Sequence, residues 1–160
     1  MASTVHVKGL AELGRALQRF DEKMRKRLVR GALRAGARII ELRAESIVPV
    51  KSGKLKRSIR ISTKQRGTLV IASVKAGATG KKGDAFYGHM VERGTRPHSL
   101  RPKLRKAIRF ADGSFARGRI EHPGAKADPF LNPALQQAAG QALEVAAAYL
   151  RNRIAVEGAR

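Results

Sequence analysis

A long run of helical periodicity near the N-terminus is the strongest constraint on how this 160-residue chain can fold. Asp21 is a suitable N-cap, and from there to about Ile47 apolar residues recur at the spacing of one helix face. Pro49 ends the run, because the residue before a proline is pushed out of the helical region of backbone space. The predicted core face of this helix holds Met24, Leu28, Ala32, Ala35, Ile39 and Ile40.

Two more helices are predicted, one before this segment and one near the C-terminus. Apolar residues from about Lys8 to Phe20 follow a single stripe, so residues 8–48 are expected to form a helical N-terminal part. The C-terminal helix is predicted over residues 132–156, with Asn132 as its N-cap and Pro133 in its first turn. Its many alanines give it a small-residue surface that lets another helix approach closely, within the subunit or between subunits.

An antiparallel hairpin is predicted over residues 55–75. Apolar and polar residues alternate from Leu55 to Thr63, with Arg57 as the one misfit on the apolar side. The tripeptide Gln65-Arg66-Gly67 favours a tight turn, and a second alternating run covers residues 68–75.

The segments between this hairpin and the last helix are expected to be short. Three glycines and two lysines make residues 76–84 a flexible loop. Residues 85–93 have the apolar period of a short helix, which Gly94 would end. Within residues 96–127, Asp112-Gly113 lies between apolar residues and predicts an inserted hairpin.

The chain is therefore predicted to be a single α+β domain over residues 1–160. A small antiparallel β-sheet would be packed by the long N-terminal helix and the long C-terminal helix. Aromatic residues make up only 4 % of the chain and Trp is absent, so Leu, Ile, Val and Ala have to build the core. No apolar run is long enough to span a membrane, and we expect no membrane partner.

The net charge of +22 predicts attraction to polyanions that weakens steeply with salt. Four arginines lie at three- and four-residue spacing on the expected outer face of the long helix. They are Arg27, Arg30, Arg34 and Arg38. This stripe fits a surface for phosphates or for an acidic partner, and it also fits a solvated helix face, which is what charge stripes usually are.

Residues that could carry catalysis or hold a metal are scattered along the chain. There is no cysteine, and His89 with Glu92 shares a helix face without a second ligand pair. We therefore predict no catalytic residue, no metal or cofactor site, and no enzyme activity. Few aromatic side chains are present to stack on bases, so any contact with DNA would be non-specific.

Three segments in the same order resemble the tailed-phage family of head–tail joining, or tail-completion, proteins, which is related in fold to tail terminators. The motif residues are Pro49, Gly53, Leu55 and Ile59 in the first segment, Tyr87, Val91, Glu92, Gly94 and Thr95 in the second, and Pro129, Phe130 and Pro133 in the third. From the residues alone, each has a folding role: Leu55 and Ile59 would point inward, and Phe130 would anchor the chain before the last helix. The insertion at residues 96–121 departs from the family pattern.

The resemblance implies a structural virion protein that completes the tail and joins it to the head, as part of a ring at the neck. Such rings are commonly sixfold, and the implied partners are further copies of the chain, the tail tube protein and head-side connector or adaptor proteins. Genomic DNA would pass nearby. The protein would be made and assembled in the host cytoplasm and would reside in the virion.

Two points are left open by the sequence. One candidate contact segment is the glycine-rich loop, which would suit an arm that orders on docking to a neighbour or to the tail tube. Its candidate residues are Gly77, Gly80, Lys81, Lys82 and Gly83. The alternative function is a basic nucleic-acid-binding protein without sequence specificity.

Overall fold

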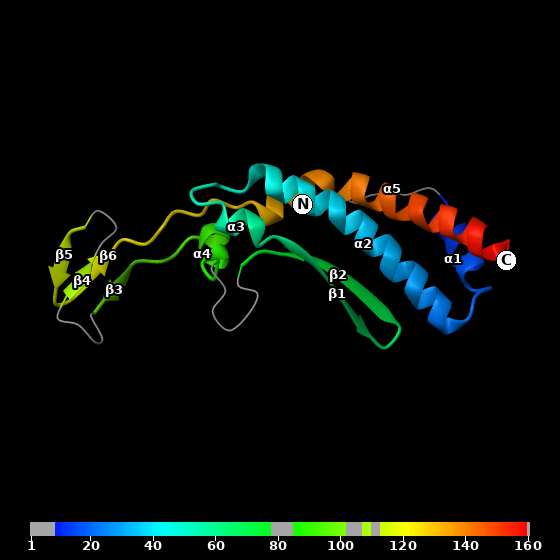
Figure 1. Cartoon of the computed structure of the whole chain (residues 1–160), viewed down its shortest axis with the longest axis horizontal. Coiled ribbons are helices and arrows are strands. Elements are labelled where there is room, and N and C mark those ends of the chain that lie inside the picture. The colour runs from blue at the N-terminus through cyan, green and yellow to red at the C-terminus, as the bar shows by residue number, and fades with distance from the viewer. Residues whose placement is uncertain (1–8, 78–84, 102–106, 110–112, 160) are drawn as a thin grey trace.

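Two long helices form the body of the molecule. The computed structural model describes residues 9–77, 85–101, 107–109 and 113–159. Helices α2 (Glu22–Ile47) and α5 (Leu131–Gly158) lie side by side and run in opposite directions, and the short α1 (Leu10–Leu17) packs near the C-terminal end of α5 (Figure 1). The predicted α+β fold with a long N-terminal and a long C-terminal helix is confirmed.

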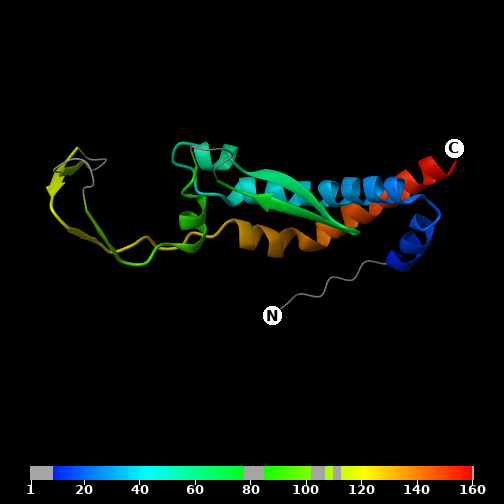
Figure 2. The ribbon, with the colours of Figure 1, turned by 90° about the horizontal axis from the view of Figure 1, so that it is seen from below.

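The main hairpin packs on α2. Strands β1 (Arg60–Arg66) and β2 (Leu69–Lys75) pair antiparallel, with Arg66 opposite Leu69 and Gly67 in the turn at a φ of 59°. Both strands contact α2, and α2 lies between the hairpin and α5 in Figure 1; Figure 2 shows the same elements from below. The turn is where the sequence predicted it.

The start of the first strand was predicted wrongly. Residues Lys54–Arg57 form a helical turn, α3, which begins after Gly53 in the left-handed conformation (φ 71°). Leu55 in α3 and Ile59, two residues after α3, are nevertheless buried, as predicted. The helical turn also places Arg57 in solvent, which removes the misfit in the expected alternation.

The ends of α2 are those that the sequence predicted. The Asp21 side chain accepts a hydrogen bond from the Met24 backbone N–H at 2.8 Å, and Val48 adopts an extended conformation before Pro49. The predicted core face is only partly correct, since Leu28 and Ala32 are buried but Met24, Ala35, Ile39 and Ile40 are half-buried. The other buried residues of α2 are Gly36, Ala37, Glu41 and Ala44.

Small residues explain why the buried face of α2 differs from the predicted one. In α5, the buried residues are all alanines, namely Ala134, Ala138, Ala142 and Ala147. They let α5 approach α2 so closely that a Cβ on Gly36 would lie 2.5 Å from the Ala142 carbonyl oxygen. The alanine surface of α5 is therefore used for packing within the subunit.

A slender arm (residues 96–126) extends from the body on the side opposite the C-terminus (Figure 1). Within it, β3 (His98–Leu100) pairs with β6 (Ile120–His122), and β4 (Ala107–Arg109) pairs with β5 (Phe115–Arg117). Strands β4 and β5 flank the Asp-Gly pair, in agreement with the predicted inserted hairpin. Each described ladder is three residues long, which by itself is marginally stable in water.

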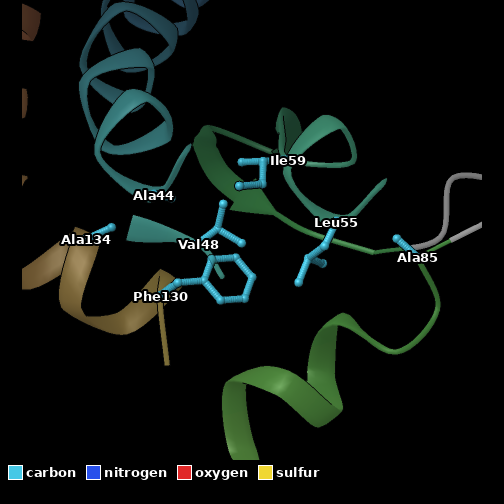
Figure 3. Packing of buried hydrophobic residues seen from close by; sticks show 7 residues of the cluster. All are labelled: Ala44, Val48, Leu55, Ile59, Ala85, Phe130 and Ala134. Atoms are coloured by element: carbon cyan, nitrogen blue, oxygen red, sulfur yellow. The ribbon is translucent and has the colours of Figure 1, made fainter. Parts of the chain in front are cut away.

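The core cluster lies where the arm, the hairpin and the helices meet. It consists of Ala44, Val48, Leu55, Ile59, Ala85, Phe130 and Ala134. Phe130 is the largest fully buried side chain, and its ring points from the start of α5 toward Val48 and Leu55 (Figure 3). Within the described part of the chain, no helix is long and apolar enough to cross a membrane.

Replacing Gly36 by alanine tests the close approach of the two long helices. In an open helix position this change stabilises by about 1 kcal/mol through helix propensity. At Gly36 the added methyl meets the Ala142 carbonyl, and we expect a loss of about 1–3 kcal/mol of unfolding free energy. Urea unfolding should be compared with Gly14→Ala in α1, where a Cβ meets no atom within 4 Å. Equal stabilisation by both changes would contradict the helix packing described here.

Candidate functional site: the junction of α4 and α5

A single carboxylate holds the start of α5. Glu92 belongs to the short helix α4 (Gly88–Arg93), and its side chain accepts hydrogen bonds from the backbone N–H groups of Phe130, Leu131 and Asn132 at 2.8, 2.9 and 2.9 Å. The first N–H groups of a helix lack partners inside the helix, and its N-terminus favours negative charge. Glu92 meets both needs from 38–40 residues away in the sequence.

The predicted cap of α5 was therefore wrong. Helix α5 begins at Leu131, its N-cap is Phe130, and the Asn132 side chain makes no capping hydrogen bond among the described contacts. Pro133 has no N–H to satisfy, and the Ala134 N–H bonds the Phe130 carbonyl at 3.2 Å. All N–H groups of the first turn are thus accounted for without a local capping side chain.

The pKa of Glu92 records this arrangement. Burial is the largest single effect and raises the pKa of Glu92. The three backbone N–H donors lower it, the Arg93 guanidinium lowers it slightly further, and together these effects exceed that of burial. The net result is a pKa below the ordinary value of a glutamate. The ionised form of Glu92 is therefore the one that the fold selects.

The residues after Glu92 form the base of the arm. Thr95 and Ala125 exchange backbone hydrogen bonds at 2.9 and 3.2 Å, and the Thr95 hydroxyl accepts a third from the Ala125 N–H at 2.8 Å. Gly94 has a φ of 70° and lies so close that a Cβ would be 2.6 Å from the Ala125 carbonyl oxygen. The second and third sequence segments are therefore two sides of one junction.

The first segment completes the junction from the other side. Leu55 and Ile59 contribute to the core cluster, against which Tyr87 and Val91 pack. An open groove of about 550 Å³ is lined by Pro49, Gly53, Leu55, Tyr87 and Val91, together with Val50, Lys51 and Ser52. The structure thus brings the predicted motif residues of all three segments together around α3, α4 and the start of α5.

The arginine stripe of α2 contacts other parts of the same chain. Arg27 bonds Glu157 of α5 at 2.9 Å, Arg30 bonds Gln65 of the hairpin at 2.8 Å, and Arg38 bonds Glu41 at 2.5 Å. Arg34 is exposed beside them. The role of these residues toward a partner or DNA stays a prediction, but three of the four now have partners within the subunit.

The glycine-rich loop is described only at its first residues. Gly77 has a φ of 111°, its N–H donates to the Ser58 hydroxyl at 2.9 Å, and its carbonyl accepts from Arg60 at 3.0 Å. The other predicted contact residues of this loop, Gly80, Lys81, Lys82 and Gly83, lie outside the described residues.

The described side chains include those of His89 and Glu92, the candidate ligand pair. Among the described residues, no group of three or more His, Asp or Glu side chains could hold a metal ion. The Glu92 carboxylate, which with His89 was the one candidate ligand pair, is occupied by the helix cap. The arrangement at the junction serves to hold elements together.

Comparison with protein families decides the class of protein. Residues 11–94, more than half of the chain, match the family described as "Bacteriophage HK97-gp10, putative tail-component". The chain belongs to this family. It is thus a phage tail component, as the sequence resemblance indicated, and the family is one of structural proteins rather than a known class of enzymes. No curated protein and no solved structure matches the chain.

The matched region ends where the arm begins. It covers the first motif segment and the second up to Gly94, whereas Thr95, the arm and the third segment with Phe130 lie beyond it. Glu92, inside the match, is hydrogen-bonded to backbone outside it. Sequence reasoning placed Glu92 in a motif but missed its role as a cap, and no local pattern around Phe130 indicates it.

Replacing Glu92 by glutamine tests the cap. The neutral amide keeps the size of the side chain but loses its charge, and its NH2 group faces backbone N–H donors. We therefore expect the unfolding free energy to fall by about 1–2 kcal/mol at neutral pH. The pKa of Glu92 is lower in the folded state than in the unfolded state, where it is about 4.3. The ionised side chain therefore stabilises the fold fully above that pH, and this stabilisation is lost as the pH falls through the pKa of the folded state. The difference between wild type and E92Q in urea unfolding should therefore shrink below about pH 4.

The matched control is Glu144→Gln on α5, whose exposed side chain has no hydrogen bond or ion pair among the described residues. It should change the unfolding free energy by less than about 0.5 kcal/mol. If E92Q and E144Q had the same small effect at pH 7, the carboxylate cap would be refuted.

Proposed function

We propose that this tail component completes the tail and joins it to the head as one subunit of a ring at the neck. The observation that carries the proposal is the extent of the subunit's surface. The chain exposes 12057 Å², whereas a compact monomer of its mass exposes about 7,900 Å². A subunit of this shape gains stability from neighbours, and a closed ring supplies a neighbour on both sides.

Exposed apolar side chains support contacts with such neighbours. Leu42 on α2 and Leu135 on α5 are 47 % and 50 % exposed. Leu135 also lines an open groove of about 650 Å³ between β2, α2 and the start of α5, and Leu42 lines another between α2 and α5. Grooves and exposed leucines at the same end of the helix pair fit a protein–protein interface.

The partners in this proposal are further copies of the chain, the tail tube protein, and a connector or adaptor protein on the head side. A sixfold ring would match the expectation from the resemblance. The subunit would be made and assembled in the host cytoplasm and then reside in the virion. A non-specific nucleic-acid-binding protein is the second candidate, favoured by the net charge of +22.

The exposed leucines provide a test that separates assembly from folding. Leu42→Gln combined with Leu135→Gln should leave the unfolding free energy within about 1 kcal/mol, because both side chains are half in solvent. Ring formation should be lost. The measurement is the mass of nuclease-treated protein by light scattering at low and high salt, with and without purified tail tubes, and with negative-stain images of the same fractions.

The control is Leu10→Gln on α1, which removes an equally exposed leucine at the other end of the helix pair. Wild type and this control should form closed rings of uniform diameter that survive high salt. A wild-type protein that stays monomeric even with tail tubes, yet shifts long DNA at low salt, would favour the second candidate.

A further inference from the structure

We propose that the arm binds duplex DNA through the phosphate backbone. This inference concerns a surface that the family match does not cover, and it does not depend on the ring. Residues 96–126 contain nine lysines and arginines against two acidic residues. The described residues of the arm alone hold six of these cations and one acidic residue, Glu121, and they extend from the body on the side opposite the C-terminus (Figure 1).

Most of the described cations of the arm are available to a ligand. Arg96, Arg101, Arg117 and Lys126 are exposed, and none of these side chains has a hydrogen bond or ion pair to the described part of the chain. Arg119 is exposed too and pairs with Glu121 at 2.5 Å. Arginine and lysine side chains free in solvent are the groups that replace counterions on a phosphate backbone.

The arm is a better phosphate-binding surface than the arginine stripe of α2. Three of the four arginines in the α2 stripe already bond Glu157, Gln65 or Glu41. A phosphate would have to displace these contacts before it could bind there. No such cost is seen for Arg96, Arg101, Arg117 and Lys126, which have no partner among the described residues.

The charge and shape of the arm favour duplex DNA over other partners. A second copy of the chain is equally basic, with a net charge of +22, and offers the cations of the arm no net negative charge to bind. Single strands are bound mainly by stacking on several aromatic rings. In the described strands of the arm, Phe115 is the one Phe, Tyr or Trp, and the His98 and His122 rings lie against each other at 5.0 Å. A two-stranded ribbon has the width that the DNA major groove admits.

The attachment of the arm makes the proposal testable without unfolding the body. The arm joins the body at the Thr95–Ala125 bridge, and the core cluster contains no residue of the arm. Substitutions of exposed arm cations should therefore leave the thermal midpoint unchanged. The test variant carries Arg96→Gln, Arg101→Gln, Arg117→Gln and Lys126→Gln in the full chain.

The measurement is binding of a fluorescent 30-base-pair duplex of random sequence by anisotropy over a series of salt concentrations. Each phosphate contact contributes about 0.9 to the slope of log affinity against log salt. We expect the variant to bind about 100-fold more weakly at 0.1 M salt, with a slope smaller by about 2–4.

A charge-matched control removes four exposed cations from the body: Arg15→Gln, Arg19→Gln, Lys23→Gln and Lys51→Gln. It has the same net charge as the arm variant and should lose less than about 5-fold in affinity, as expected for screened charges outside the contact. Equal losses in both variants would overturn the proposal, as would a wild type without salt-dependent binding. If polyglutamate bound as tightly as DNA, and if the same arm substitutions abolished that binding, the partner of the arm would be an acidic protein instead.

Discussion

The carboxylate of Glu92 is the interaction on which the rest of the structure depends. It fixes α4 to the first turn of α5 through three backbone N–H groups. That attachment positions Phe130, whose fully buried ring fills the core cluster between α2, α3 and α5. It also fixes the two chain segments that enter and leave the arm, because Gly94 and Thr95 follow Glu92 directly and pair with Ala125.

The sequence predicts the parts of this fold that depend on local chemistry. The ends of α2 follow from Asp21 and Pro49, and the turn of the hairpin follows from Gly67. The prediction fails where the same apolar spacing fits both a helix and a strand, and where a residue distant in the sequence determines where a helix begins. Leu55 and Ile59 fit one face of a strand and of a helical turn alike, and only the left-handed Gly53 before them favours the turn. The start of α5 is set by a side chain 38–40 residues away, so Asn132 looked like a cap.

The same limit applies to the candidate site. The three motif segments could be recognised in the sequence, and each residue was expected to have a folding role. Their meeting at one junction follows from long-range hydrogen bonds that periodicity does not reveal. The arginine stripe was visible as a pattern, but its contact with Glu157 joins residues 130 positions apart. The stripe lies in solvent, but three of its four arginines bond residues of the same subunit.

We propose that this tail component lies at the neck of the virion, between tail and head. The most direct measurement is electron microscopy of purified virions labelled with gold-conjugated antibody against the chain. We predict label at the head–tail junction of intact particles, and unattached filled heads and tails when the chain is not produced. Absence of the chain from purified virions, or label at the far end of the tail, would contradict the account.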